Sequence, residues 1–217
     1  MSAGIGLFKA IMDSAPKLNL DDVNPTGYTS FIYDAEDAQI AELHGADANR
    51  VYVPIDQIPD YVQKAVISIE DERFYKHNGI DLEGIFRAGF LNLSSGDIKG
   101  QGASTLTQQV IKNNVLTNEV TFERKIQEWA LAMELEKHWS KEQILENYLN
   151  TIALGRGTNG VETASKKYFN KDVWDLTLAE AAVLAATIQA PTYQDPYNHP
   201  ERNKEQQHIV LKKMLNF

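Results

Sequence analysis

The sequence predicts a mainly α fold with a small N-terminal β element. From Pro59 onward, apolar residues recur at three- and four-residue spacings, which is the period of amphipathic helices. Before Pro59, the segment Tyr28 to Asp34 alternates apolar and polar residues and is rich in aromatics, which is typical of a strand. With 217 residues, the chain is long enough for one domain with its own core.

Composition and charge exclude several classes of function. The absence of cysteine rules out a disulfide scaffold, thiol catalysis and cysteine metal sites. The formal net charge of -9 argues against a general nucleic-acid binder. No apolar run reaches the roughly 20 residues of a membrane-spanning helix. The best candidate, Ala181 to Ala190, is short and is better interpreted as a buried core helix.

The N-terminal part is predicted to be an arm followed by the small sheet. Residues 1–27 lack a clear period, contain Pro16 and Pro25, and fit an arm with one short helix, Gly6 to Met12. Three segments are expected to pair into the sheet: Tyr28 to Asp34, Gln39 to Leu43 and Arg50 to Val53.

The first predicted long helix starts at Pro59 and ends at Glu70. Pro59 suits a first helical position, and one face is apolar through Val62, Ala65, Val66 and Ile69. Further helices are expected at Leu82 to Leu93, Thr105 to Asn113, Phe122 to Trp139, Lys141 to Asn150, Gly160 to Tyr168 and Leu178 to Gln189. Two of them begin with capping-box patterns, Ser140 with Gln143 and Thr177 with Glu180. The glycine- and serine-containing stretch Asn92 to Gly102 is expected to be a mobile loop.

Glu70 is the strongest candidate for acid–base chemistry. It is predicted to lie at a helix C-terminus, next to Asp71 and Glu72. The partial negative charge of the helix end and the two acids disfavour ionisation, so we expect a raised pKa suited to a general base. The same pattern also fits a solvated acidic helix end.

Two further clusters are candidates for substrate binding. The stretch Ser104 to Gln109 gathers hydroxyls and amides, although it also fits an ordinary helix start with Ser104 as N-cap. Glu128 follows Arg124 by one helical turn, so one helix face can present both charges to a phosphate. The alternative is an exposed i, i+4 pair contributing roughly 0.3 kcal/mol.

Four ordered motifs support a family resemblance. They are Glu70 to Gly79, Gly102 to Gln109, Arg124-Lys125-x-x-Glu128, and Lys141 to Asn150. From about Tyr28 to Glu201, the chain resembles the family 51 glycosyltransferase domain, the peptidoglycan polymerase of class A penicillin-binding proteins and of monofunctional transglycosylases. The resemblance implies a lysozyme-like helical glycosyltransferase domain over 28–217. It also implies that the arm 1–27 follows a membrane anchor missing from this chain.

The resemblance assigns roles to the motif residues. Glu70 matches the glutamate that activates the acceptor hydroxyl, and Glu128 matches the second catalytic glutamate, which orients or stabilises the pyrophosphate leaving group. Residues matching the substrate-binding positions are Phe74, Ser104, Thr107, Gln108, Gln109, Lys112, Arg124, Lys125 and Glu162. Phe74 is expected to shape the turn after Glu70 rather than react. The chain departs from the family pattern at two positions, because Val120 and Gln127 stand where the family often has arginine and lysine. The loss of these two positive charges implies weaker binding of the donor.

The implied function is polymerisation of lipid II into β-1,4-linked glycan strands, with inversion and release of undecaprenyl pyrophosphate. The implied partners are lipid II, the lipid-linked glycan strand, the membrane surface, moenomycin-type inhibitors and a C-terminal transpeptidase domain, but no nucleic acid. The implied location is the extracytoplasmic face of the bacterial membrane. Family members often respond to a divalent cation such as Mg²⁺, but no cofactor or metal-ligand spacing is evident here.

Two alternatives stay open for the function. A lysozyme-like or lytic glycan-cleaving enzyme can use the same fold and a glutamate acid. A catalytically silent module would only hold the lipid-linked precursor. The apolar residues Ile85, Phe86, Phe90, Leu91 and Leu93 are expected to touch the bilayer, although they also fit a core helix beside a loop.

Overall fold

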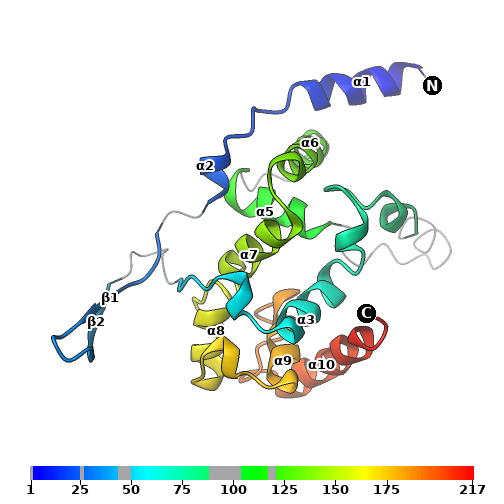
Figure 1. Ribbon diagram of the computed structural model, residues 1–217. Helices are drawn as coiled ribbons and strands as arrows, with labels where there is room; N and C mark the ends of the chain where they lie inside the picture. Colours follow the sequence, from blue (N-terminus) through cyan, green and yellow to red (C-terminus); the bar gives the residue numbers. More distant parts are fainter. Residues whose placement is uncertain (1, 25–26, 44–49, 88–103, 117–120) are drawn as a thin grey trace. The chain divides into compact units, whose positions relative to one another are not determined.

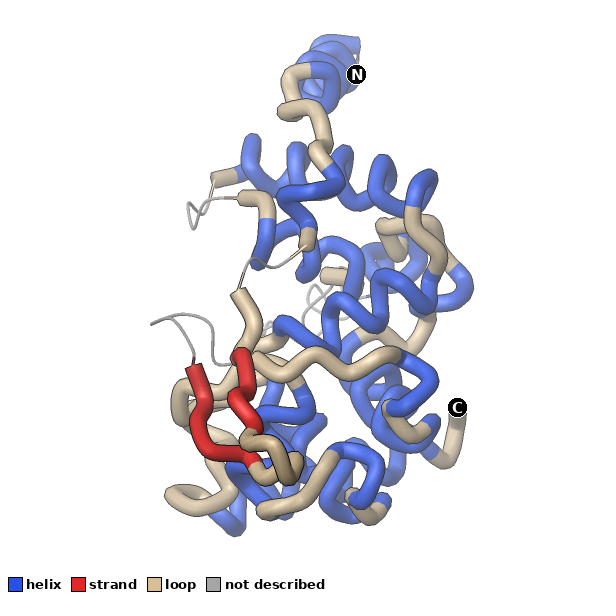
Figure 2. Tube along the Cα trace, turned by 60° about the vertical axis from the view of Figure 1, so that its left-hand side comes forward, coloured by secondary structure: helices blue, strands red, loops and turns tan. Residues whose placement is uncertain are grey.

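The computed structural model of the chain (Figures 1 and 2) describes residues 2–24, 27–43, 50–87, 104–116 and 121–217. The predicted mainly α class is confirmed, because the described residues form helices and one two-stranded sheet. The chain divides into two compact units. The first unit comprises Met1–Asn24 and Arg73–Ile144, and the second comprises Pro25–Glu72 and Leu145–Phe217. The predicted arm therefore groups with the first unit, while its boundary at residue 27 stays a prediction.

The first unit is built around the pair α5 and α6, which pack against each other. Its elements are α1 (Ser2–Asp13), α2 (Leu20–Val23), η2 (Phe74–Lys76), a helical stretch at 82–87, α5 (Leu106–Asn114), α6 (Phe122–His138) and the start of α7 (Lys141–Thr151). Both central helices begin at a threonine N-cap. Thr105 accepts from the backbone N–H of Gln108, and Thr121 accepts from that of Arg124.

The second unit places α9 at its centre. Its elements are β1 (Ser30–Tyr33), β2 (Gln39–Leu43), η1 (Ile55–Gln57), α3 (Asp60–Glu70), most of α7, α8 (Val161–Phe169), η3 (Val173–Asp175), α9 (Leu178–Ile188) and α10 (Pro200–Met214). Helix α9 contacts α3, α8 and α10, and most of its side chains are buried. The prediction of a buried core helix at Ala181 to Ala190 is thus confirmed. Among the described residues, no helix is both long and apolar enough to span a bilayer.

The small sheet has fewer strands than the sequence suggests. Strands β1 and β2 pair antiparallel, with Ser30 opposite Leu43 and an irregularity after Ile32. The predicted third strand at Arg50 to Val53 is wrong. Both backbone polar groups of Val53 bond instead to the amide side chain of Asn150, at 2.8 and 2.9 Å. An α7 side chain thus replaces a neighbouring strand.

Most helix predictions are confirmed, with two corrections. Helix α3 buries the predicted apolar face, and both capping boxes form. Ser104 as N-cap is wrong, because Thr105 occupies that position. Helix α10 was not expected at all. Of the predicted helix Leu82 to Leu93, residues 82–87 are helical; its remainder and the predicted loop Asn92 to Gly102 lie outside the described residues.

Candidate active site

Glu70 is the last residue of α3 and is half-buried. The buried Asp71 caps the helix, and its backbone N–H donates to the carbonyl of Ile67 at 2.8 Å. Tyr148 of α7 is fully buried, and its pKa is raised well above 10 by burial first and then by the charges of Glu70 and Asp71. The two acids therefore act electrostatically on the interior of the second unit. The raised pKa expected for Glu70 itself stays a prediction.

Glu128 lies on α6 in the first unit, and its side chain is only 1% exposed. The exposed-pair alternative is therefore wrong. The carboxylate forms ion pairs with two cations of the same helix, Arg124 at 3.4 Å and Lys125 in a shorter contact. Because an unpaired buried carboxylate is strongly disfavoured, these two cations make its burial possible.

Lys125 connects Glu128 to the start of α5. Its ammonium donates to Ser104 Oγ at 2.8 Å, to Gln108 Oε1 at 3.2 Å and to Glu128 Oε1. An ammonium has three N–H donors, so these acceptors use all of them. Arg124 differs, because its Nε and Nη1 atoms are buried and have no hydrogen-bond partner among the residues that the structure describes. Arg124 is thus the cation of this cluster with donors left for an anion.

Gly79 joins the turn after Glu70 to the start of α5. Its carbonyl accepts from Thr105 Oγ1 at 2.7 Å and from Gln108 Nε2 at 3.2 Å. The residue has φ +88°, and a Cβ placed here would lie 2.7 Å from the backbone carbonyl group of Ala132. Only glycine fits this close approach to α6 without strain. The first and second motifs are therefore held together through one backbone carbonyl.

The remaining candidates divide into buried and accessible side chains. Phe74, Thr107 and Gln108 are fully buried, so in this structure their side chains contact protein. The Thr107 hydroxyl donates to Glu136 at 2.6 Å. Lys112 is exposed on α5, and two other residues are partly exposed, Ser104 and Gln109. These three are the accessible candidates of the first unit, whereas the open donors of Arg124 are buried.

Glu162 lies at the start of α8 and is buried. Its carboxylate accepts from the backbone N–H of Val173 at 2.7 Å. Burial raises its pKa to about 7; the Val173 N–H opposes that shift and a hydrogen bond to Asp172 adds to it. The pKa of Asp172 is lowered, first by its bond to Lys166, which lies 2.5 Å away. In this structure Glu162 joins α8 to η3, and its expected contact with substrate stays a prediction.

Glu136 and Lys141 also contact the candidate residues, although local sequence patterns did not single them out. Glu136 binds both Thr107 and Lys141, and the Lys141 ammonium lies 4.5 Å from the ring centre of Phe74. Lys141 stands inside the fourth motif, so the motif itself was a signal. Glu136 gave none, because its partner Thr107 is 29 residues away in the chain.

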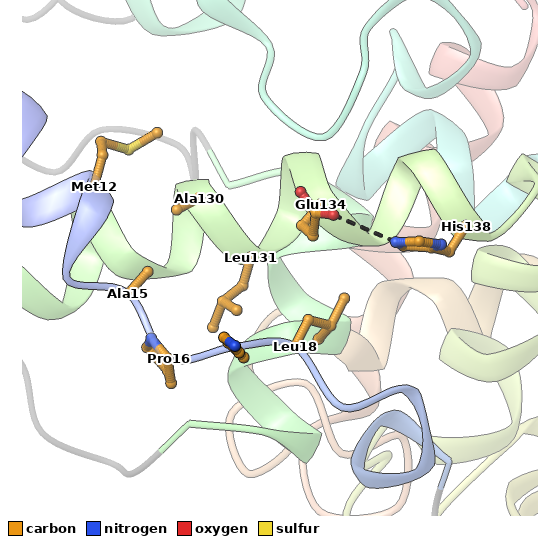
Figure 3. A pocket seen from close by; sticks show the side chains of 9 residues that line it. Met12, Ala15, Pro16, Leu18, Ala130, Leu131, Glu134 and His138 are labelled. Carbon is orange, nitrogen blue, oxygen red and sulfur yellow. Dashed lines mark hydrogen bonds and ion pairs between the residues drawn. The ribbon is translucent and has the colours of Figure 1, made fainter.

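A pocket of about 390 Å³ lies elsewhere in the first unit, between the segment after α1 and helix α6 (Figure 3). Its described lining is Met12, Ala15, Pro16, Lys17, Leu18, Ala130, Leu131, Glu134 and His138. None of these is a predicted site residue, although Glu134 and His138 approach to 3.3 Å. Within the described part of the chain, no three His, Asp or Glu side chains gather in a way that could hold a metal ion.

Comparison with known proteins places the chain in a family. The family model described as transglycosylase matches residues 36–215. The chain is 45% identical over 213 residues to penicillin-binding protein 1A of Aquifex aeolicus, covering 97% of this chain and 28% of that protein. It is 46% identical to penicillin-binding protein 1A of Clostridium tetani, covering 88% and 24%. It is 44% identical to penicillin-binding protein 1F of Bacillus subtilis, covering 84% and 25%.

A solved structure also matches. The crystal structure of penicillin-binding protein 1A from Haemophilus influenzae aligns with 88% of this chain and 18% of its own, at 21% identity and a TM-score of 0.44. The chain belongs to the transglycosylase family. The description of that family, transglycosylase, names an enzyme that transfers glycosyl groups. The chain spans about a quarter of the length of these curated relatives.

Proposed function

We propose that this domain polymerises lipid II into β-1,4-linked glycan strands and releases undecaprenyl pyrophosphate. The observation that carries the proposal is the charge cluster on α6. There a buried carboxylate, Glu128, holds two cations in place, and one of them, Arg124, keeps buried guanidinium donors without protein partners among the described residues. A guanidinium with open donors matches the geometry of a phosphate, which guanidinium groups bind in a bidentate way.

Glu70 acts as the general base in this proposal. It takes the proton from the 4-hydroxyl of the acceptor sugar while that oxygen attacks the anomeric carbon of the donor. The bond from that carbon to the α-linked pyrophosphate breaks, and the leaving group departs with the electron pair on the opposite face, so the new bond is β. The half-buried position of Glu70 at a helix C-terminus supports this role, because both features favour a basic carboxylate.

The cations act on the leaving group. Arg124 binds the pyrophosphate oxygens through its open donors, while Lys125 and Glu128 hold the arrangement around it. Lys112 adds positive charge from α5. Developing negative charge is stabilised most where donors are fixed before the reaction begins. The proton transfer and the stabilisation of the leaving group are assigned here to side chains of this chain alone.

We also propose contact with the outer, extracytoplasmic surface of the bacterial membrane. Phe86 is 76% exposed and Leu82 is 59% exposed on the helical stretch 82–87. Of the other expected contacts, Ile85 on the same stretch is partly exposed, and Phe90, Leu91 and Leu93 lie outside the described residues. Exposed apolar side chains on a domain that takes a lipid-linked substrate suit an interfacial position. The further partners that we propose for the domain are moenomycin-type inhibitors and, in the longer relatives, a transpeptidase domain.

The membrane proposal is tested with vesicles. Phe86→Ser with Phe90→Ser should weaken vesicle binding several-fold in a protein with unchanged melting temperature, because each serine removes apolar area. Leu215→Ser, which alters another highly exposed apolar residue, is the matched control. Equal binding by the double variant and the wild type would contradict the proposal.

The function itself is tested by product analysis with purified lipid-linked disaccharide-peptide. The wild type should lengthen glycan strands and release undecaprenyl pyrophosphate. Glu70→Gln keeps the shape and removes the base, so polymerisation should fall by about 10²–10⁴-fold with the fold intact. Shortening of preformed strands would establish the lytic alternative, and binding without either product would establish the silent module. Near-normal synthesis by Glu70→Gln would sink the assignment of the base.

A further inference from the structure

Glu136 lies in the last turn of α6 and joins three elements. Its Oε1 atom accepts from the Thr107 hydroxyl of α5 at 2.6 Å and from the Lys141 ammonium at the start of α7 at 2.7 Å. Its side chain is 6% exposed. Lys141 in turn lies over the ring of Phe74, 4.5 Å from its centre. These four residues form a continuous set of contacts within the first unit, which we call the Glu136 brace.

A contribution to stability does not by itself explain why these four residues form the Glu136 brace. A buried ion pair loses hydration that its attraction only partly restores, and apolar replacements of similar volume are often neutral. A hydrogen bond from a hydroxyl to a carboxylate is, by contrast, strong and directional. The Glu136 brace therefore contributes orientation more than it contributes stability, and the side chains that it orients are Thr107 and Phe74.

The start of α5 is held at two points on α6. Thr107 is bound by Glu136, and the next residue, Gln108, is bound by Lys125. Lys125 and Glu136 lie about three turns apart, on the same side of α6, because a turn takes 3.6 residues. Successive helix residues point about 100° apart. Two anchors on successive residues of α5 thus fix both the position of its first turn and its rotation about the helix axis.

That first turn follows Ser104 and includes Gln109, two of the partly exposed candidates for donor binding. We propose that Glu136 and Lys141 are positioning residues, which hold the first turn of α5 and the ring of Phe74 in the orientation that donor binding requires. This inference rests on the proposed function. Neither residue needs to touch the substrate, because both act through Thr107 and Phe74.

The test uses two variants and their combination. Thr107→Val keeps the shape and removes the hydroxyl, while Glu136→Gln keeps the shape and removes the charge. Each should raise the KM for the lipid-linked donor about tenfold, with kcat changed much less, because a small displacement of binding groups is costly. The double variant should be little worse than either single variant, since both remove one interaction.

The matched control is the exposed pair Glu134 and Lys137 in the same part of α6, which are 2.6 Å apart. Glu134→Gln and Lys137→Met should leave the donor KM unchanged. A merely structural brace would instead lower the melting temperature of Thr107→Val and Glu136→Gln and leave the donor KM of the folded fraction unchanged. That result, or additive effects in the double variant, would overturn the inference.

Hydrogen exchange separates this inference from the proposed function. The backbone N–H groups of Gln108 and Gln109 bond to the side chain and the carbonyl of Thr105. In Thr107→Val their exchange should be about tenfold faster than in the wild type. If the wild type made no glycan, the proposed function would be refuted. The exchange rates of Gln108 and Gln109 would still show whether the Glu136 brace orders the first turn of α5. Unchanged exchange would overturn the inference, as would faster exchange with an unchanged donor KM in an active enzyme.

Discussion

Glu128 in the middle part of α6 and Glu162 in the first turn of α8 are both buried carboxylates, with exposed fractions of 1% and 3%. Their surroundings are opposite in charge. Glu128 pairs with Arg124 and Lys125. Glu162 has a backbone N–H on one side and the carboxylate of Asp172 on the other. Burial is therefore the same in the two regions, and the partners decide what each carboxylate can do.

The two networks also end differently. The Glu128 network leads to Arg124, whose buried Nε and Nη1 have no hydrogen-bond partner among the described residues, so it can accept an anion. The described contacts of Glu162 are with Val173 and Asp172, and Asp172 in turn pairs with Lys166. All the members of this network thus lie in α8 and the segment that follows it. Under the proposed function, the first region binds the donor, while the contacts of Glu162 in the second region hold α8 to the segment that follows it.

The largest effect that separates the regions is expected from Glu128→Gln. Without the carboxylate, Arg124 and Lys125 repel each other, and the arrangement around the donor is lost. Turnover should fall about a hundredfold at pH 7, since misplaced binding groups cost that much. Initial rates with saturating and limiting donor measure the loss. A larger fall in Glu162→Gln than in Glu128→Gln would reverse the assignment.

A smaller effect is expected from Arg124→Lys. Lysine keeps the charge but lacks the planar set of donors that binds phosphate in a bidentate way. The KM for the donor should rise about tenfold, and binding of a moenomycin-type inhibitor should weaken by a similar factor. Lys137→Arg, at an exposed position on the same helix, controls for a general effect of exchanging the two cations. An unchanged donor KM would show that Arg124 does not contact the pyrophosphate.

Local spacing predicted parts of the fold and of the Glu128 region. The period of apolar residues predicted α3 and its buried face, and the one-turn spacing predicted the pair of Arg124 and Glu128. Helix α10 was missed because its sequence is mostly polar, and among its residues only Asn203 and Val210 are buried. A helix with so small a buried face gives almost no periodic signal.

Contacts between distant residues could not be predicted in this way. Val53 and Asn150 are 97 residues apart, and Gly79 and Gln108 are 29 apart. Each pair is a side chain that bonds a backbone group, and the spacing of residues along the chain does not show which two of them come together. The pKa of Glu162 could not be predicted for a similar reason, because it depends first on burial and then on Val173 and Asp172, which lie beyond the end of α8.

The titration of Glu162 gives a smaller effect, on stability. Its pKa is about 7 in the folded protein and 4.5 ordinarily, so the folded state binds more protons between these values. The free energy of unfolding should therefore fall as pH rises from 4.5 to 7 and level off above 7. We expect a loss on the order of 1 kcal/mol, after screening by solvent is considered.

Urea unfolding at pH 5 and pH 8 measures this effect. Glu162→Gln should lose less stability than the wild type between the two values, because the variant cannot ionise. The carboxyls of Asp172, Glu180 and Asp195 have lowered pKa values, so they titrate below this window. Equal pH dependence in the two proteins would show that Glu162 is not the titrating group.

The smallest effect is expected from adding a cation to the Glu128 region. By the family resemblance, Val120 takes the place of an arginine; it lies outside the described residues, just before Thr121, the N-cap of α6. Val120→Arg should lower the donor KM about threefold at low salt, because a positive charge is added near a leaving pyrophosphate. The gain is limited, since a cation at a helix N-terminus opposes the helix dipole by a few tenths of a kcal/mol. The gain should shrink at about 0.5 M salt, as expected for exposed charges.

Two control variants test whether the added charge is the cause. Val120→Lys should lower the donor KM as Val120→Arg does, and Val120→Gln should leave it unchanged. An equal gain from glutamine would show that charge is not the cause.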